Sequence, residues 1–345
     1  MIRKTGLLIS AMALVGAAVS GPVLANNTVT AIKVDKPPML SGGASDPAWA
    51  KAKALTVTLT GGANFKDGKT RATIKAVYAG DMIYMLVQYK DQTLSARRLP
   101  YQKQADGSWK KLRDPKDQGG DENVYYEDKL ALLWNIGNST KNFGQLGCMS
   151  SCHAGEAGKP YGNKYTSVAG ETGDIWHVKS VRTGPIGQVD DQYLDDTRFD
   201  QEKSPGAGRK SDPKISGGYA NIELVDGKPE FMNRNAIASN KKGGTYYLKV
   251  EDKSPFDDSK FKPGDEVASI MISPFGGDRG DIVAAMSWKK GSWTVVMSRK
   301  MVTGSQYDVL FDKLDGTYEF GLAAFDNAQV RHAFHIGPLK LQFRQ

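Results

Sequence analysis

The chain has 345 residues, of which 46 are basic and 38 acidic, so its formal net charge is +8. The lysines are scattered among acidic residues and no basic-aromatic motif occurs, which argues against a nucleic-acid partner and indicates a solvated surface or a docking face for an acidic protein. Beyond the first 25 residues no stretch approaches ~18 consecutive apolar residues, so we expect no stable membrane insertion.

The chain opens with the pattern of a secretory signal peptide. Arg3 and Lys4 supply the positive start, residues 7–19 are apolar but too few to span a bilayer, and Ala25 is a small residue suited to a cleavage site. A retained N-terminal anchor fits this short run less well. We therefore expect residues 1–25 to be removed, residues 26–345 to form one domain, and the mature protein to work in the periplasm.

Short runs rich in β-branched and aromatic residues recur between turn-forming residues. Residues 54–60 and 71–79 alternate with period two, and Gly80-Asp81 then turns the chain into residues 82–89. Similar runs follow at 129–136, 245–250, 266–272, 292–298, 317–325 and 329–343. The pattern predicts an all-β fold, specifically an antiparallel β-sandwich.

Three segments lack this periodicity and are expected to be loops. Residues 99–123 and 201–218 are polar and rich in turn formers, which is typical of surface loops. Residues 138–173 form a long glycine-rich segment, and a loop of that length inside a compact domain is usually functional. We therefore place the chemistry in this third segment.

Both cysteines of the chain lie in the sequence GCMSSCHAGE, residues 147–156. Three residues separate Cys148 from Cys152, and His153 follows directly, so the pattern is the Cys-x-x-Cys-His signature of covalent haem attachment with one extra residue. Two thiols can bond one haem c while the adjoining imidazole ligates its iron. The small serines between the cysteines allow the extra residue to bulge.

Two other interpretations of the motif compete with haem. A disulfide between Cys148 and Cys152 is permitted in the periplasm, but it would close a very short loop and constrain the unfolded chain little. A structural zinc ion needs about four Cys or His ligands, and a histidine directly after a cysteine is poor tetrahedral spacing. We therefore favour haem, with His153 as one iron ligand.

A second iron ligand is sought among the other histidines, because eleven methionines make methionine a poor discriminator. In VRHAFHIG, alternation places His332 on the apolar face with Val330 and Phe334, so it is expected to point inward. An inward histidine is more often a hydrogen-bonded core residue, but beside a haem motif we take His332 as the distal ligand. His335, on the polar face, is the alternative, and His177 in GDIWHVKS is a third candidate.

Six segments covering nearly the whole mature chain carry a family resemblance: SDPAWAKA, IKAVYAGDMIYMLVQYKD, YYEDKLALLWNI, GDIWHVKSVRTGPIGQVDDQYLDD, GSWTVVMSRKM and YEFGLAAFDNAQVRHAF. On these segments the chain resembles the haem-binding γ subunits of ethylbenzene dehydrogenase and dimethyl sulfide dehydrogenase. Within that family it is most similar to the c-type branch that carries its own attachment motif. The Ile-Trp-His-x-Lys element is the most specific of the matches.

The resemblance implies a DOMON/CBM9-like β-sandwich whose long loops hold one haem at its end. In the γ subunits a methionine before the Ile-Trp-His element and a lysine near the C-terminus hold the haem without covalent bonds. Here residues 148–153 replace the methionine region and residues 330–335 replace the lysine region, which again favours His332, with Met149 as a minor alternative. The resemblance leaves three roles open for His177 and Lys179: hydrogen bonding, pairing with the haem propionates, or structural packing.

We therefore expect a periplasmic c-type cytochrome that transfers single electrons through one haem c and is not itself an enzyme. Bis-histidine ligation leaves no open iron position, which a peroxidase-like haem enzyme would need. The partners implied are redox proteins, either a molybdenum oxidoreductase or respiratory cytochromes. The alternative is a haem-free sandwich that binds a carbohydrate or another small ligand, since the Asp46-Pro47-Trp49 entry and fourteen tyrosines suit stacking on sugars.

Overall fold

The computed structural model describes residues 27–117, 120–153 and 164–345, so the expected signal peptide lies outside the described residues. Strands dominate these ranges, and the α-helix α1 (Phe143–Leu146) has a single turn. Within the same ranges, no helix has the length and apolar character needed to cross a membrane.

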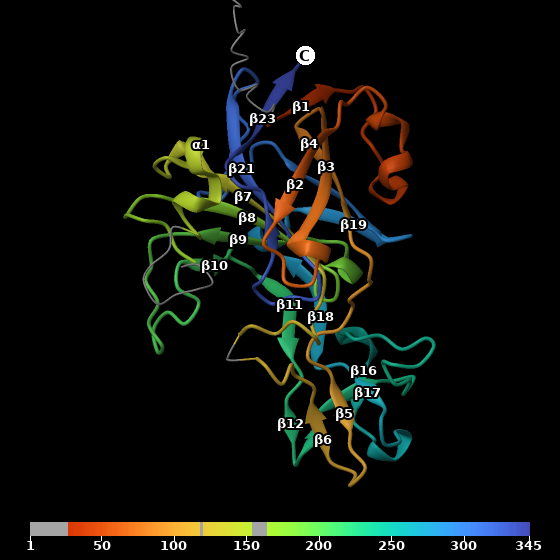
Figure 1. Ribbon diagram of the computed structural model, residues 1–345. Coiled ribbons are helices and arrows are strands. Elements are labelled where there is room, and N and C mark those ends of the chain that lie inside the picture. Colours follow the sequence, from red (N-terminus) through yellow and green to blue (C-terminus); the bar gives the residue numbers. More distant parts are fainter. Residues whose placement is uncertain (1–26, 118–119, 154–163) are drawn as a thin grey trace, which may run out of the picture.

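Thirteen strands form one large sheet, seen in the upper body of Figure 1. They are β1 (Thr28–Lys33), β2 (Leu55–Thr60), β3 (Lys69–Ala79), β4 (Met82–Lys90), β7 (Lys129–Asn135), β8 (Gly173–Lys179), β9 (Asp190–Leu194), β10 (Arg209–Ser211), β19 (Val283–Trp288), β20 (Ser292–Lys300), β21 (Thr317–Phe325), β22 (Ala333–Phe334) and β23 (Leu339–Arg344). The order is β10-β9-β8-β7-β21-β22-β2-β3-β4-β20-β19, while β23 pairs with β21 and β1 pairs with β23 and β3. Only the two pairings of β1 are parallel within this sheet.

The two halves of the sheet pack face to face around one hydrophobic core. Ile74, Val87 and Val295, from β3, β4 and β20, are fully buried in the same cluster as Leu132 of β7 and Leu322 of β21. Alternation selects the buried side chains, since every second residue is buried through the first part of β3. The prediction of an all-β, largely antiparallel sandwich is confirmed.

A smaller lobe lies below the sandwich in Figure 1. Its strands are β5 (Tyr101–Lys103), β6 (Trp109–Lys111), β11 (Ser216–Asn221), β12 (Leu224–Val225), β13 (Lys228–Pro229), β14 (Phe231–Asn233), β15 (Leu248–Lys249), β16 (Lys253–Pro255), β17 (Glu266–Val267) and β18 (Ile270–Gly276). They form the sheets β17-β5-β6 and β11-β18-β15 and the pairs β12-β13 and β14-β16. The lobe has apolar clusters of its own, one around Trp109 and one around Ile222. The expectation of one domain over residues 26–345 stays a prediction.

Two of the three expected loops contain strands, so the prediction was wrong there. Residues 99–123 include the hairpin β5-β6, and residues 201–218 include β10 and the start of β11. These strands escape sequence analysis because β5, β6 and β10 have three residues each, too few to show a period. The described part of residues 138–173 is irregular apart from short helical turns and the start of β8, as expected.

Candidate functional site

The cysteine motif lies in the loop between β7 and β8, directly after α1. Cys148 is in the 3₁₀ turn Gly147–Ser150, and Cys152 and His153 follow that turn. The backbone N–H of His153 donates to the carbonyl oxygen of Cys148 at 3.0 Å, which folds the motif back on itself. Gly147 has a φ of +55°, and a Cβ there would lie 2.6 Å from the carbonyl carbon of Gly337. Glycine therefore allows the motif loop to pack directly against the closing segment of the chain.

Both cysteines are free thiols. They pack against a small apolar cluster made of Leu133, Phe143, Ile175 and Leu194. Burial raises the pKa of Cys152 to about 11 and also raises the pKa of Cys148, so both thiols are neutral at pH 7. Among the described residues, the only groups suited to share a metal ion consist of aspartates. The disulfide and zinc interpretations therefore gain no support.

The imidazoles of His153 and His332 face each other beside the thiols. Their Nε2 atoms lie 3.2 Å apart, and their ring planes are inclined by 72°. Burial lowers the pKa of both rings, that of His332 to about 3, so both are neutral at pH 7 and have a nitrogen lone pair for a metal. Two imidazoles bonded to one metal ion at ~2 Å hold their nitrogens about 4 Å apart. A small outward shift of either ring would make that room.

His332 reaches this position from a turn rather than from a strand. The predicted alternation of Val330, His332 and Phe334 is wrong, because the strand β22 contains only Ala333 and Phe334 and the core residue is Ala333. The cause is a tight turn in which the N–H of His332 donates to the carbonyl of Val330 at 2.8 Å. The ring still turns inward as expected: its Nδ1 is buried and has no hydrogen-bond partner among the described residues.

Two phenyl rings hold the facing imidazoles in place. Phe334 stacks on His153 with ring centroids 4.3 Å apart and an angle of 12° between the planes. Phe325, at the end of β21, lies 4.6 Å from His332 on its other side. Because aromatic rings exclude water and restrict rotation, these contacts orient both nitrogens toward the same point.

His177 and Lys179 of β8 lie next to this pair but outside it. His177 stands 5.6 Å from Phe325 between ring centroids, its Nδ1 lies 3.3 Å from Oε1 of Gln192, and its Nε2 is buried without a partner among the described residues. The ammonium of Lys179 forms a buried ion pair with Asp190. Lys179 is therefore engaged in the fold, whereas His177 keeps one nitrogen unused.

The two alternative ligands have other surroundings. The Nδ1 of His335 lies 3.1 Å from the carbonyl oxygen of Gly337, within its own turn. Met149 is 40% exposed. Of the residues singled out from the sequence, the structure brings His153 and His332 into contact and packs Cys148 and Cys152 against one apolar cluster. His153 connects the two groups because it follows Cys152 in the chain.

Cations that the sequence analysis did not single out border the site. Lys129 of β7 is buried, with its ammonium 4.0 Å from the centroid of Phe325. Lys129 and Arg209 both lower the pKa of His332, after burial and the neighbouring histidine, and Lys164 lies near the second cysteine. Of these cations, Lys129 is the one that the sequence could have indicated, because it directly precedes the apolar run LALLW.

Comparison with known proteins finds one matching family and solved structures of low sequence identity. A family model described as ethylbenzene dehydrogenase matches residues 46–336. No curated protein matches the chain. A carbohydrate binding module of family 9 from Caldicellulosiruptor kristjanssonii, solved with glucose, is 9% identical with a TM-score of 0.33, covering 92% of this chain and 97% of that one. A protein from Bacteroides uniformis described as carbohydrate-binding is 10% identical with a TM-score of 0.36, covering 92% and 99%. These structural scores carry no functional argument.

Proposed function

We propose that this chain, which belongs to the ethylbenzene dehydrogenase family, is a periplasmic c-type cytochrome that transfers single electrons through one haem c. Cys148 and Cys152 would form the thioether links, and His153 and His332 would be the axial ligands. The observation that carries the proposal is the pair of neutral imidazoles facing each other at 3.2 Å beside two free thiols.

The surroundings of the four residues fit a haem. The thiols rest on an apolar cluster, which suits a macrocycle, and the buried Nδ1 of His332 has no described partner that would hold the ring back from a metal. A bound haem would supply an iron centre that alternates between the ferrous and ferric states. Two imidazole ligands leave no open iron position, so the set favours electron transfer over oxygen or substrate chemistry.

The neighbouring cations suit the two carboxylates of a haem. Lys129, Lys164 and Arg209 lie around the site. Burial lowers the pKa of both lysines, and a propionate beside them would raise it again. Lys179, for which propionate pairing was one of three roles left open, already neutralises Asp190. We therefore assign propionate pairing to Lys129, Lys164 and Arg209. We assign a structural role to Lys179.

The N-terminal pattern and the family support the cellular setting. A cleaved signal peptide over residues 1–25 would deliver the chain to the periplasm, where haem c is attached. The redox partners proposed are a molybdenum oxidoreductase or respiratory cytochromes. Covalent attachment would keep the haem with a carrier that moves between such partners.

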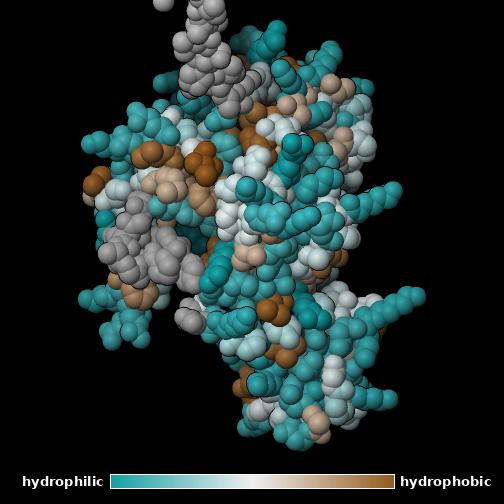
Figure 2. All heavy atoms as spheres, in the orientation of Figure 1, coloured by the Kyte–Doolittle hydropathy of each residue, from teal (hydrophilic) through white to brown (hydrophobic). Residues whose placement is uncertain are grey.

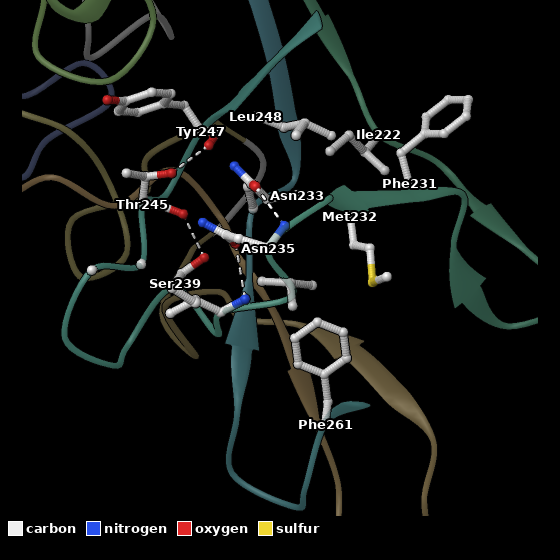
Figure 3. A pocket seen from close by; sticks show the side chains of 15 residues that line it. Ile222, Phe231, Met232, Asn233, Asn235, Ser239, Thr245, Tyr247, Leu248 and Phe261 are labelled. Atoms are coloured by element: carbon white, nitrogen blue, oxygen red, sulfur yellow. Dashed lines mark hydrogen bonds between the residues drawn. The ribbon is translucent and has the colours of Figure 1, made fainter. Parts of the chain in front are cut away.

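The pocket in the small lobe (Figure 3) gives the carbohydrate-binding alternative little support, and the larger cavities of about 520 and 440 Å³ lie elsewhere, beside Asp91 and Asp308. The small-lobe pocket has a volume of about 90 Å³, whereas pockets for small ligands usually measure roughly 300–1,000 Å³. Its polar groups are also used internally: the hydroxyl of Ser239 donates to the carbonyl of Thr245 at 2.6 Å, and Oδ1 of Asn233 accepts from the N–H of Asn235 at 3.1 Å. A sugar would find few free partners there.

An absorption spectrum of the full-length protein, expressed in a host that matures c-type cytochromes, tests the proposal. We expect a low-spin six-coordinate haem in both redox states, with colour that stays with the polypeptide in acid acetone. His332→Ala should become high-spin, while the matched variant His335→Ala should remain low-spin. A colourless protein, or colour extracted by acid acetone, would remove the proposal. A low-spin His332→Ala would remove its distal ligand.

A further inference from the structure

A cluster of aspartates meets inside the sandwich, separate from the cysteine motif. Its six members come from five segments of the chain: Asp174 in β8, Asp191 in β9, Asp212 after β10, Asp278 and Asp281 after β18, and Asp308 between β20 and β21. We call these six residues the aspartate cluster. Carboxylate oxygens of Asp174, Asp191 and Asp308 lie within 4.8 Å of one another, and so do those of Asp278, Asp281 and Asp308.

The carboxylates of the cluster are buried and short of hydrogen-bond donors. Asp174 and Asp191 are fully buried, and Asp308 and Asp212 are 1% and 2% exposed. Both oxygens of Asp212 and Oδ1 of Asp174 are buried without a hydrogen bond or an ion pair to a described residue. Oδ1 of Asp308 and Oδ2 of Asp191 have Arg299 nearby, at 3.3 and 4.0 Å. Buried polar atoms are normally paired, so unpaired carboxylate oxygens gathered in one place require a hydrogen-bond donor or a cation.

Asp212 is the most telling member of the cluster. Its backbone N–H donates to the carbonyl of Asp191 at 3.2 Å, which places it beside the group. Burial, and after it the charges of Asp174 and Asp308, raises the pKa of Asp212 to about 9, so the carboxyl groups are close enough to repel one another. Neither oxygen of Asp212 has a described partner.

One internal cation is too little for this group. Nη1 of Arg299 lies 2.9 Å from Asp174 and 3.3 Å from Asp308, but 4.0 Å from Asp191. No ion pair joins Asp212 or Asp281 to a cation in the part of the chain that the structure describes. A single guanidinium cannot pair with six carboxyl groups, so burial and mutual repulsion raise the pKa of Asp212 to about 9 and that of Asp308 to about 7 when no further cation is bound.

We propose that the aspartate cluster is a calcium site, with Asp308, which belongs to both groups of three, as its central ligand and Asp212 beside it. Ca²⁺ takes 6–8 oxygen ligands at roughly 2.3–2.6 Å, so its ligand oxygens lie within about 5 Å of one another. The oxygens of each group of three meet this condition, since all lie within 4.8 Å of one another. The all-oxygen donor set disfavours softer metals, and the burial disfavours Mg²⁺, which keeps several waters. The ion would tie β8, β9 and β10 to the loop between β20 and β21.

Calcium binding to the mature protein, stripped with a chelator and then dialysed, tests this inference. Titration calorimetry with CaCl₂ should show saturable binding, and millimolar CaCl₂ should raise the Tm on the order of 5 °C. MgCl₂ at the same ionic strength serves as the control and should give a much smaller shift. No heat of binding and no calcium-dependent change in Tm would overturn the proposal, as would equal shifts from both salts.

Variants locate the ion. Asp212→Asn and Asp308→Asn keep the side-chain size and remove one buried charge each, so both should fold and lose the calcium-dependent Tm shift. Asp281→Asn, at a half-buried position, repeats the test if either fails to fold. Asp91→Asn is the matched control, because Asp91 belongs to a different buried group with Asp128 and Asp326, and it should keep the shift. Calcium binding that survives the cluster variants, or is lost only in Asp91→Asn, would contradict the assignment.

Discussion

The thiol of Cys148 lies directly against the backbone of Gly321. A Cβ built on this glycine would overlap the sulfur, so β21 is without a side chain at the place where Cys148 contacts it. The contact joins the first cysteine of the motif to a central strand of the sandwich, two strand pairings away from β2 and next to β7. The position of the thiol is therefore set by the sheet and not by the loop alone.

Gly321→Ala should displace Cys148 and impair haem attachment. The added methyl group cannot share the space of the sulfur, and overpacking of this kind costs roughly 1–3 kcal/mol. We expect a lower yield of haem-bound protein at a lower Tm, measured by the ratio of Soret absorbance to protein. Ala323→Gly, two residues along the same strand, is the control and should keep the ratio unchanged. A normal ratio in Gly321→Ala would show that the contact does not position the thiol.

Phe334→Ala should loosen the proximal imidazole. Its ring stacks on His153 at 4.3 Å, so its removal frees the imidazole to rotate and lets water approach. We expect a mixture of spin states that changes with temperature, recorded in the absorption spectrum of the oxidised protein. Phe343→Ala, which removes an aromatic ring packed on Tyr78, controls for general destabilisation. A spectrum identical to that of the parent protein would argue against this role of the stack.

Arg209→Gln should lower the reduction potential of the proposed haem. A nearby positive charge disfavours the more positive ferric state, so its removal shifts the potential downward on the order of tens of millivolts. A redox titration at low ionic strength measures the shift. Arg234→Gln, in the small lobe, removes the same charge where it pairs with Asp252 and should leave the potential unchanged. An upward shift in Arg209→Gln would contradict the placement of this charge beside the iron.

Asp91→Asn should flatten the pH dependence of stability in the presence of a chelator. Burial and the charge of Asp326 raise the pKa of Asp91 to about 7, and burial and Asp91 raise that of Asp128 to about 8. A raised folded pKa means that the native state holds protons which the unfolded chain has lost above its ordinary pKa of about 3.9, so stability falls as pH rises from about 4 to 8.

The slope at stake is at most about 1.4 kcal/mol per pH unit for each proton. The amide of Asp91→Asn removes one charge, while its oxygen can still accept from the N–H of Thr93, as Oδ1 does at 3.1 Å. Urea unfolding at a series of pH values should give a smaller slope than in the parent protein. The exposed control Asp226→Asn should keep the slope of the parent protein. An unchanged slope in Asp91→Asn would show that Asp91 does not contribute to the pH dependence of stability.

The sheet was predictable because its strands are long enough to show a period. Alternation identified β2, β3, β4, β20 and β21 to within two residues. The small lobe was not predictable in this way, since its strands have two or three residues in most cases and its core rests on scattered aromatics such as Trp109 and Phe261. Periodicity carries no information at that length.

The part of the candidate site that depends on the spacing of residues along the chain was predictable. The part that depends on tertiary contacts was not. The motif from Cys148 to His153 is local in sequence, so its residues were found at once. The prediction that the ring of His332 points inward was right, but the reason given for it was wrong. His332 lies in a turn that begins at Val330 and not in the expected strand. Arg209 and the aspartate cluster depend on segments that meet only in the fold, and a single sequence gives no sign of such meetings.

The intact mass of the mature protein shows whether haem is covalently attached. Purified from the periplasm of a host that attaches haem c, the chain should have the mass of residues 26–345 plus one haem, and the double variant Cys148→Ala/Cys152→Ala should have the mass of the polypeptide alone. A parent protein with the bare polypeptide mass from the same host would contradict the account.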